Sequence, residues 1–143
     1  MKQAILFSLA IFFAQWLQAQ SAISFDITYS AQGNCADAAT KTAPAMDLYL
    51  YPLDKENGIT PLYAKDGKHA NVKAGRYLVT RYPLDHPDDL QFYRDWYSGK
   101  NDIANPDTDR RTVNKKVIYV GKDLKQQTFA YHYHNYCGFQ IDP

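Results

Sequence analysis

The chain has 143 residues, of which 45% are hydrophobic and 22% charged, with 16 basic against 15 acidic side chains. Such a composition is too apolar for a disordered segment. Its near-zero net charge also offers no attraction to a polyphosphate backbone, so we expect no nucleic-acid partner. The most unusual features are its 12 tyrosines and a single glutamate, Glu56.

Residues 1–19 have the pattern of a secretory signal peptide. Lys2 precedes the uncharged run 4–17, and Ala19 supplies a small residue at the expected cleavage site. The run is shorter than the roughly 20 apolar residues of a membrane-spanning helix, and no second such run follows it. We therefore expect a protein that is secreted, or periplasmic in a bacterium, with no membrane span after cleavage. An uncleaved anchor is the alternative.

Cleavage after Ala19 would leave residues 20–143, in which basic and acidic residues are equal in number, as a single domain. The only two cysteines, Cys35 and Cys137, are expected to form a disulfide in an oxidising compartment. Closing a loop of about 100 residues would contribute about 4 to 5 kcal/mol in the chain-entropy model. A catalytic thiol or a thiolate metal site lacks support, because the chain has no Cys-x-x-Cys pair.

Short runs of alternating apolar and polar residues, separated by turn residues, predict seven β-strands. These strands are expected at 23–27, 46–51, 59–62, 69–72, 77–82, 111–120 and 127–134.

In the first strand Ile23, Phe25 and Ile27 share one apolar face. In the second, the aliphatic residues point inward, which places Tyr49 and Tyr51 toward the rim or solvent.

Residues 30–45 are predicted to form a loop. Asn57-Gly58, Asp66-Gly67, Ala74-Gly75 and 121–123 are predicted turns. Pro61 marks the third strand as an edge strand, because proline cannot donate to a neighbour. Seven short strands in about 120 residues predict an all-β fold, a single antiparallel two-sheet sandwich.

The run Tyr63–Val79 resembles the centre of carboxypeptidase-regulatory-like and collagen-adhesin B-type domains, which are small transthyretin-like sandwiches. Their pattern of a strand, Asp-Gly, a short strand, and Gly-x-Tyr is matched by Asp66-Gly67 and by 75–77. The resemblance covers about 45–82, with a weaker match over 116–133. It implies an immunoglobulin-like or transthyretin-like scaffold with Tyr77 in the core, and it implies no particular activity. The long insertion after Tyr82 departs from the family, and so does the lone Glu56, because the buried acid of some adhesin domains is not recognisable.

The insertion, 83–109, contains seven aspartates against one arginine and one lysine, together with four aromatic residues. Asp88 is a predicted cap for a short helix that Gly99 would end. In that helix Leu90, Tyr93 and Tyr97 would share one face, and Phe92 and Trp96 another.

Three interpretations of the insertion remain open. The aromatic residues attach it to the sheet, or they form a ligand surface, or its aspartates bind calcium. The ligand surface would consist of Tyr93, Asp95, Trp96 and Tyr97, since flat rings stack on sugars and carboxylates accept hydroxyl hydrogen bonds. The calcium site would use Asp102, Asp107 and Asp109, although no recognised loop spacing is present.

His132 and His134 lie two residues apart in the last predicted strand, so both imidazoles share a face that alternation places in solvent. This pair suits zinc or copper, but a third ligand is needed, and only His69 or His86 remain. Simple solvated histidines are the alternative.

No nucleophile elbow, zinc-protease motif or phosphate loop occurs, so no catalytic residues are expected. We expect a non-catalytic binding module for an extracellular or cell-envelope protein or glycan. A small metal-binding protein, or a periplasmic inhibitor or immunity protein, is the alternative.

Overall fold

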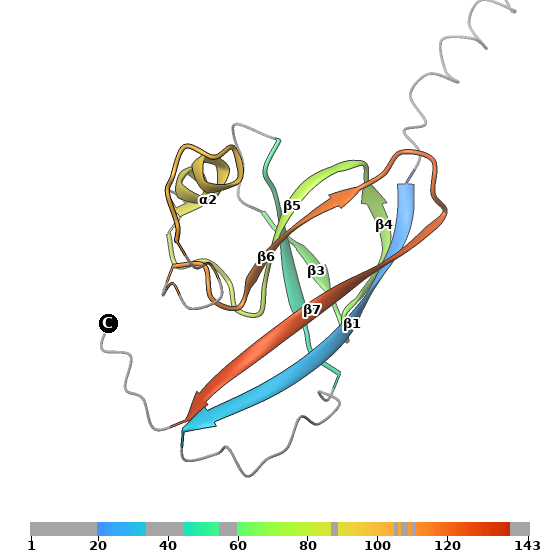
Figure 1. The fold of residues 1–143 in the computed structure, drawn as a ribbon. Helices are drawn as coiled ribbons and strands as arrows, with labels where there is room; N and C mark the ends of the chain where they lie inside the picture. The colour runs from blue at the N-terminus through green and yellow to red at the C-terminus, as the bar shows by residue number, and fades with distance from the viewer. Residues whose placement is uncertain are drawn as a thin grey trace, which may run out of the picture.

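The structure is a computed structural model, and it describes residues 20–33, 45–54, 60–86, 89–104, 106, 109 and 111–137. Seven strands and one helix occur in these residues (Figure 1). They are β1 (Gln20–Gly33), β2 (Leu48–Pro52), β3 (Leu62–Ala64), β4 (Lys68–Lys73), β5 (Gly75–Thr80), α2 (Asp89–Tyr97), β6 (Lys115–Val120) and β7 (Gln126–Cys137). The predicted signal peptide, Cys35, the Asn57-Gly58 turn, Asp88 and Asp107 lie outside the described residues.

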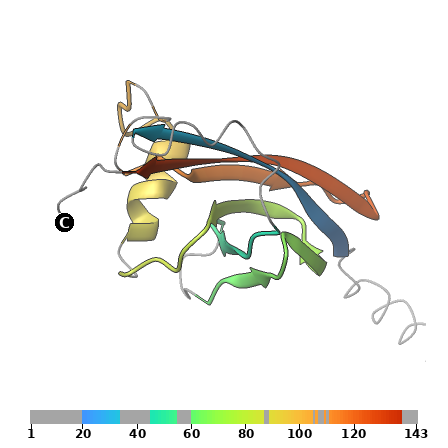
Figure 2. The ribbon, with the colours of Figure 1, turned by 90° about the horizontal axis from the view of Figure 1, so that it is seen from below.

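The strands form two sheets, with the orders β4-β1-β7 and β3-β2-β5-β6. Figure 2 shows the long strands β1 and β7 lying over the sheet that contains β2 and β5, with α2 at one end. The predicted all-β fold with two sheets is therefore confirmed. So is the position of β3, whose Pro61 flank marked it as an edge strand. Helix α2, the only helix of the described residues, is too short to cross a membrane.

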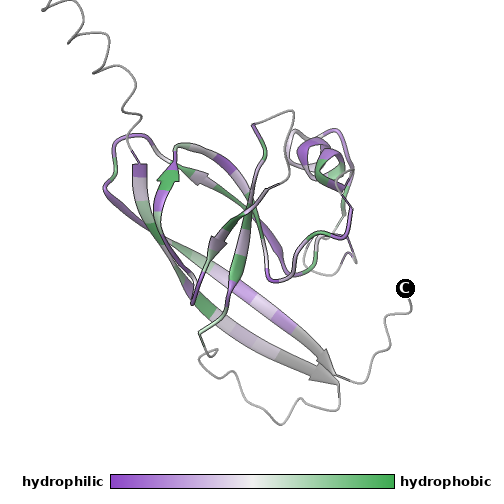
Figure 3. Ribbon diagram, turned by 180° about the vertical axis from the view of Figure 1, so that it is seen from behind, coloured by the Kyte–Doolittle hydropathy of each residue, from purple (hydrophilic) through white to green (hydrophobic). Residues whose placement is uncertain are grey.

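The core between the sheets follows the alternation of the sequence. Ile23 and Phe25 of β1 pack in one cluster with Leu48 and Leu50 of β2, and all four are at least nine-tenths buried. Each such side chain contributes about 1.5 to 3 kcal/mol relative to exposure. Along the strands in Figure 3, apolar and polar segments alternate, as expected where one face of a strand is buried.

The predicted turns at Asp66-Gly67 and Ala74-Gly75 are present in the structure. Asp66 and Gly67 have φ of 51° and 70°, and the Lys68 amide donates to the Lys65 carbonyl at 2.9 Å. Two successive residues with positive φ are the geometry of a type I′ hairpin turn. Gly75 has a φ of 150°, and the next residue but one, Tyr77, lies in the core as expected.

The pairing of β1 with β7 corrects the prediction of an all-antiparallel sandwich. The two strands run parallel over 12 residue pairs, from Ala22 opposite Gln126 to Gly33 opposite Cys137. Alternation records which face a residue points to, but it does not record the direction of the neighbouring strand. The first and last strands of the described residues thus lie side by side, although residues that pair, such as Ala22 and Gln126, are 104 positions apart in sequence.

Several strand boundaries also differ from the prediction, three of them as follows. Strand β1 extends to Gly33, because β7 supplies pairing partners for residues that were expected to begin a loop. Strand β6 begins at Lys115 rather than Arg111, because 111–114 form turns that end in Asn114 with a φ of 58°. Strand β3 begins at Leu62, later than expected.

The prediction that Tyr51 faces the rim or solvent is wrong, because only 2% of its surface is exposed. The outer face of the β3-β2-β5-β6 sheet is covered by α2, and this contact buries a second cluster: Tyr51, Leu53, Leu78, Leu90 and Tyr93. A strand that is covered on both faces loses its polar alternation. This explains why β5 is buried from Tyr77 through Thr80.

Candidate functional site

Helix α2 ends as the sequence predicts, at Gly99. Gly99 has a φ of 75°, its amide donates to the Trp96 carbonyl at 3.0 Å, and the Lys100 amide donates to the Asp95 carbonyl at 2.8 Å. This pair of bonds is a Schellman motif. The chain therefore turns back at the end of the helix, and the Lys100 ammonium lies 3.5 Å from the Asp95 carboxylate.

The inner face of α2 attaches the insertion to the sheet. Leu90 and Tyr93 are 2% and 5% exposed, and the Tyr93 hydroxyl donates to the Arg111 carbonyl at 2.8 Å. Burial raises the pKa of this phenol. Tyr93, predicted as a ligand residue, is thus buried in the contact between α2 and the sheet. Trp96, also predicted as a ligand residue, is half-buried against the same cluster.

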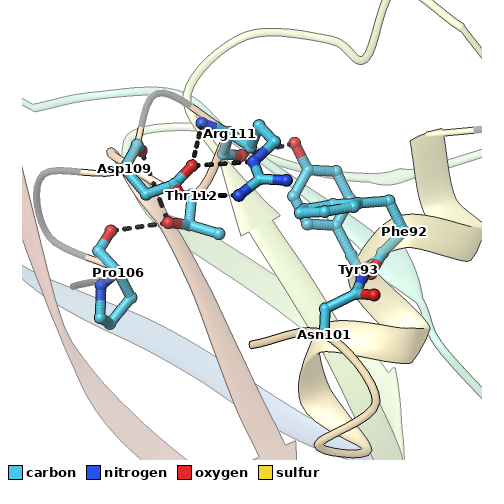
Figure 4. Close-up of polar contacts among 7 residues, drawn as sticks. All are labelled: Phe92, Tyr93, Asn101, Pro106, Asp109, Arg111 and Thr112. Carbon is cyan, nitrogen blue, oxygen red and sulfur yellow. Dashed lines mark hydrogen bonds and ion pairs between the residues drawn. The ribbon is translucent and has the colours of Figure 1, made fainter. Parts of the chain in front are cut away.

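The segment after α2 is held against the helix by a polar network (Figure 4). The Arg111 guanidinium lies 5.0 Å from the centre of the Phe92 ring, and Asn101 donates to the Phe92 carbonyl. Both carboxylate oxygens of Asp109 accept hydrogen bonds from Arg111. The Asp109 carboxylate, which was a candidate calcium ligand, is therefore already paired with Arg111. No group of three metal-binding side chains occurs in the described residues.

The remaining predicted ligand residues, Asp95 and Tyr97, line a hollow of about 490 Å³ between α2 and the sheet. We call it the α2 hollow. Its charged and aromatic lining residues are Asp54, Arg76, Arg94, Asp95, Tyr97 and Lys100. The structure thus brings together two of the four predicted residues, and it adds an acid and a base from the ends of β2 and β5.

Arg76 lines the α2 hollow and is hydrogen-bonded to Asp54. Its backbone amide and its Nε donate to the two oxygens of Asp54 at 2.8 and 2.6 Å, and its Nη2 lies 2.5 Å from Oδ1. Burial opposes the charge on Asp54, but these bonds outweigh it and lower the pKa of the carboxyl. Gly75 allows this approach, because a Cβ there would lie 3.2 Å from an Asp54 oxygen.

Two exposed tyrosines flank Arg76. Its guanidinium carbon lies 5.0 Å from the centre of the Tyr97 ring, which is 45% exposed. Tyr119, 59% exposed, is opposite Arg76 in the β5–β6 register and so shares its face of the sheet. Sequence reasoning missed both Arg76 and Tyr119. Alternation would have placed Arg76 outward, since the next residue, Tyr77, points into the core.

The α2 hollow therefore offers flat rings beside fixed donors and acceptors. Arg94 donates through Nε to the Leu53 carbonyl at 3.1 Å, and Asp95 accepts from Gln91 at 3.0 Å. These bonds restrict both side chains before any ligand arrives, which lowers the entropic cost of binding. Such a set suits a neutral or acidic molecule rich in hydroxyl groups.

His132 and His134 lie together on the outer face of β7, with ring centres 4.3 Å apart. Both rings are hydrogen-bonded to hydroxyl groups of β1. Neither His69 nor His86 joins them in a group of three metal-binding side chains within the described part of the chain. The predicted third ligand of a zinc or copper site is therefore not supplied there.

Comparison of the chain with family models, with curated proteins and with solved structures finds no match.

Proposed function

We propose that this protein is an exported, non-catalytic binding module that takes a carbohydrate in the α2 hollow. The observation that carries the proposal is the arrangement of Arg76, which Asp54 holds in place beside the exposed ring of Tyr97, with Tyr119 opposite it on the neighbouring strand. A sugar ring would stack on Tyr97 while its hydroxyl groups bond to the charged side chains around it.

The charges of the α2 hollow favour a glycan over a purely apolar ligand. Asp95 supplies acceptor oxygens for hydroxyl groups, while Arg94 and Lys100 supply donors at the same end of α2. Three cationic side chains face two carboxylates in this lining, so a sugar that carries a carboxylate would also fit.

The proposal also includes the fold family and the export of the protein. The Asp66-Gly67 and Gly75 turns support a transthyretin-like sandwich of the carboxypeptidase-regulatory type. The apolar first 19 residues support export, and export supports a disulfide between Cys35 and Cys137. A binding module outside the cytoplasm would meet cell-envelope and extracellular glycans.

A glycan array probed with the purified protein tests this function. We expect binding to a related set of glycans, and about tenfold weaker binding by Tyr97→Ala, because a stacked ring contributes on the order of 1.4 kcal/mol. Tyr82→Ala is the matched control. Tyr82 is 62% exposed and also lies against an arginine, Arg81, but it does not line the α2 hollow.

Two results would contradict the proposal. One is an array on which no glycan binds above background. The other is equal loss of binding in Tyr97→Ala and Tyr82→Ala, which would place the sugar elsewhere.

A further inference from the structure

A second hollow, of about 270 Å³, lies where β5 ends and β6 begins. We call it the Lys115 hollow. Its charged lining residues are Arg81, Asp85, Asp89 and Lys115. It shares no described lining residue with the α2 hollow, so the two hollows are separate parts of the surface.

The amine of Lys115 lies among groups that all line this hollow. Its Nζ is 5.7 Å from the centre of the Tyr93 ring, and the carboxylates of Asp89 and Asp85 are close enough to act on its charge. All three of these neighbours are lining residues of the Lys115 hollow. Val117, two residues along β6, packs against the cluster that α2 covers, so the Lys115 side chain lies on that same face of the sheet.

This amine has no partner of its own within the described part of the chain. Its Nζ makes no hydrogen bond and no ion pair there, although two carboxylates line the same hollow. The side chain is half-buried, and burial lowers the pKa of the amine, while the charges of Asp89 and Asp85 oppose this effect without cancelling it. The neutral amine, which is the nucleophilic form of lysine, is therefore easier to reach here than on an exposed lysine.

The other cationic lining residue, Arg81, lies against aromatic rings. Its guanidinium carbon is 5.1 Å from the centre of the Tyr82 ring and 4.3 Å from the centre of the Tyr133 ring, and both tyrosines line the hollow. Leu84 adds an aliphatic side chain to the lining. Because flat and aliphatic surfaces surround the few charged groups, the hollow suits a small organic molecule.

We propose that Lys115 is a covalent attachment site for small hydroxylated aldehydes, which it binds as an imine. The neutral amine adds to the carbonyl carbon, and the resulting carbinolamine loses water. Overall, an ammonium group and an aldehyde become an iminium ion and water, so no oxidant or reductant is needed. The positive charge stays on the nitrogen, where Asp85 and Asp89 stabilise it, and hydroxyl groups of the aldehyde can donate to the same carboxylates. The site does not depend on the carbohydrate proposal.

Reductive trapping with glyceraldehyde tests this site. The full chain is incubated at pH 7 with limiting glyceraldehyde and sodium cyanoborohydride, which reduces an imine to a stable secondary amine. Peptide mapping by mass spectrometry then gives the initial rate of modification at each lysine. We expect Lys115 to react at least about threefold faster than Lys68 and Lys122, which are exposed lysines outside the hollow. In urea, which unfolds the hollow, the three rates are expected to become equal.

Asp85→Asn tests whether the charges of the hollow act on this amine. Asp85 raises the pKa of Lys115, so its removal is expected to move the pH midpoint of Lys115 modification downward. Asp123→Asn, which changes an exposed loop aspartate outside the hollow, is the control and is expected to leave the midpoint unchanged. The proposal is overturned if Lys115 reacts no faster than Lys68 and Lys122 in the folded protein, if its advantage persists in urea, or if both aspartate variants move the midpoint equally.

Discussion

Asp109 and Arg111 form a compact contact of two residues that closes the insertion. The Asp109 carboxylate accepts hydrogen bonds from the backbone amide, the Nε and the Nη2 of Arg111, at 2.9, 3.0 and 2.9 Å. These bonds lower the pKa of Asp109 to about 2 from 3.8, because they favour the charged carboxylate. Sequence reasoning assigned Asp109 to calcium, since a count of acidic residues does not show which of them already has a basic partner.

This contact predicts a specific dependence of stability on pH. A depressed pKa stabilises the fold fully above about pH 4, and that stabilisation is lost as the pH falls toward 2. We therefore expect Asp109→Asn to be less stable than the wild type at pH 7 and the difference to shrink below pH 4. Urea unfolding at a series of pH values measures it, with Asp123→Asn, an exposed loop aspartate, as the control. A difference independent of pH would contradict the assignment.

At the scale of elements, α2 shows which features of a helix can be predicted from its own residues and which cannot. Its nine residues are too few for a stable isolated helix, so packing must hold it. The sequence correctly predicted its existence, its end at Gly99 and the shared face of Leu90 and Tyr93, but not that this face is the buried one. It did not predict which surface the helix covers, and Tyr51 was assigned to solvent for that reason.

The docking of α2 predicts unequal effects for two tyrosines on one helix. Tyr93→Phe removes the hydroxyl that donates to the Arg111 carbonyl, so we expect a loss of about 1 kcal/mol in the free energy of unfolding. Tyr97→Phe, in an exposed ring, is expected to change it by less than about 0.5 kcal/mol. Chemical denaturation of both variants measures the difference. Equal losses would show that the Tyr93 hydroxyl bond does not stabilise the docked helix.

At the scale of the whole molecule, the parallel pairing of β1 with β7 joins the two ends of the described chain. It positions the core side chains of both strands, such as Phe25 against Tyr131 with ring centres 6.4 Å apart. It also creates the outer face on which Ser30 meets His132 and His134. The α2 hollow is likewise formed by segments that are distant in sequence.

The register of this pair predicts a selective cross-link. Ser24 and Thr128 are opposite each other, with their hydroxyl oxygens 3.0 Å apart. We expect the double variant Ser24→Cys/Thr128→Cys to oxidise to a disulfide, because opposite residues of paired strands meet the distance requirement of the bond. Ser24→Cys/Ala130→Cys, out of register by two residues, is the control. Peptide mapping by mass spectrometry identifies the linked residues, and preferential linkage in the control would show a different register.

The sequence by itself determined the strands, their buried faces, the tight turns and the short helix, because these depend on local periodicity and on residues suited to particular backbone angles. The inward positions of Leu48, Tyr77 and Val79 follow from alternation alone. Only the tertiary structure decided the direction of β7 beside β1, the burial of Tyr51 and Tyr93, and the meeting of Arg76 with Asp54 and Tyr97. Those outcomes depend on contacts between distant segments, and side-chain periodicity carries no information about which segments meet.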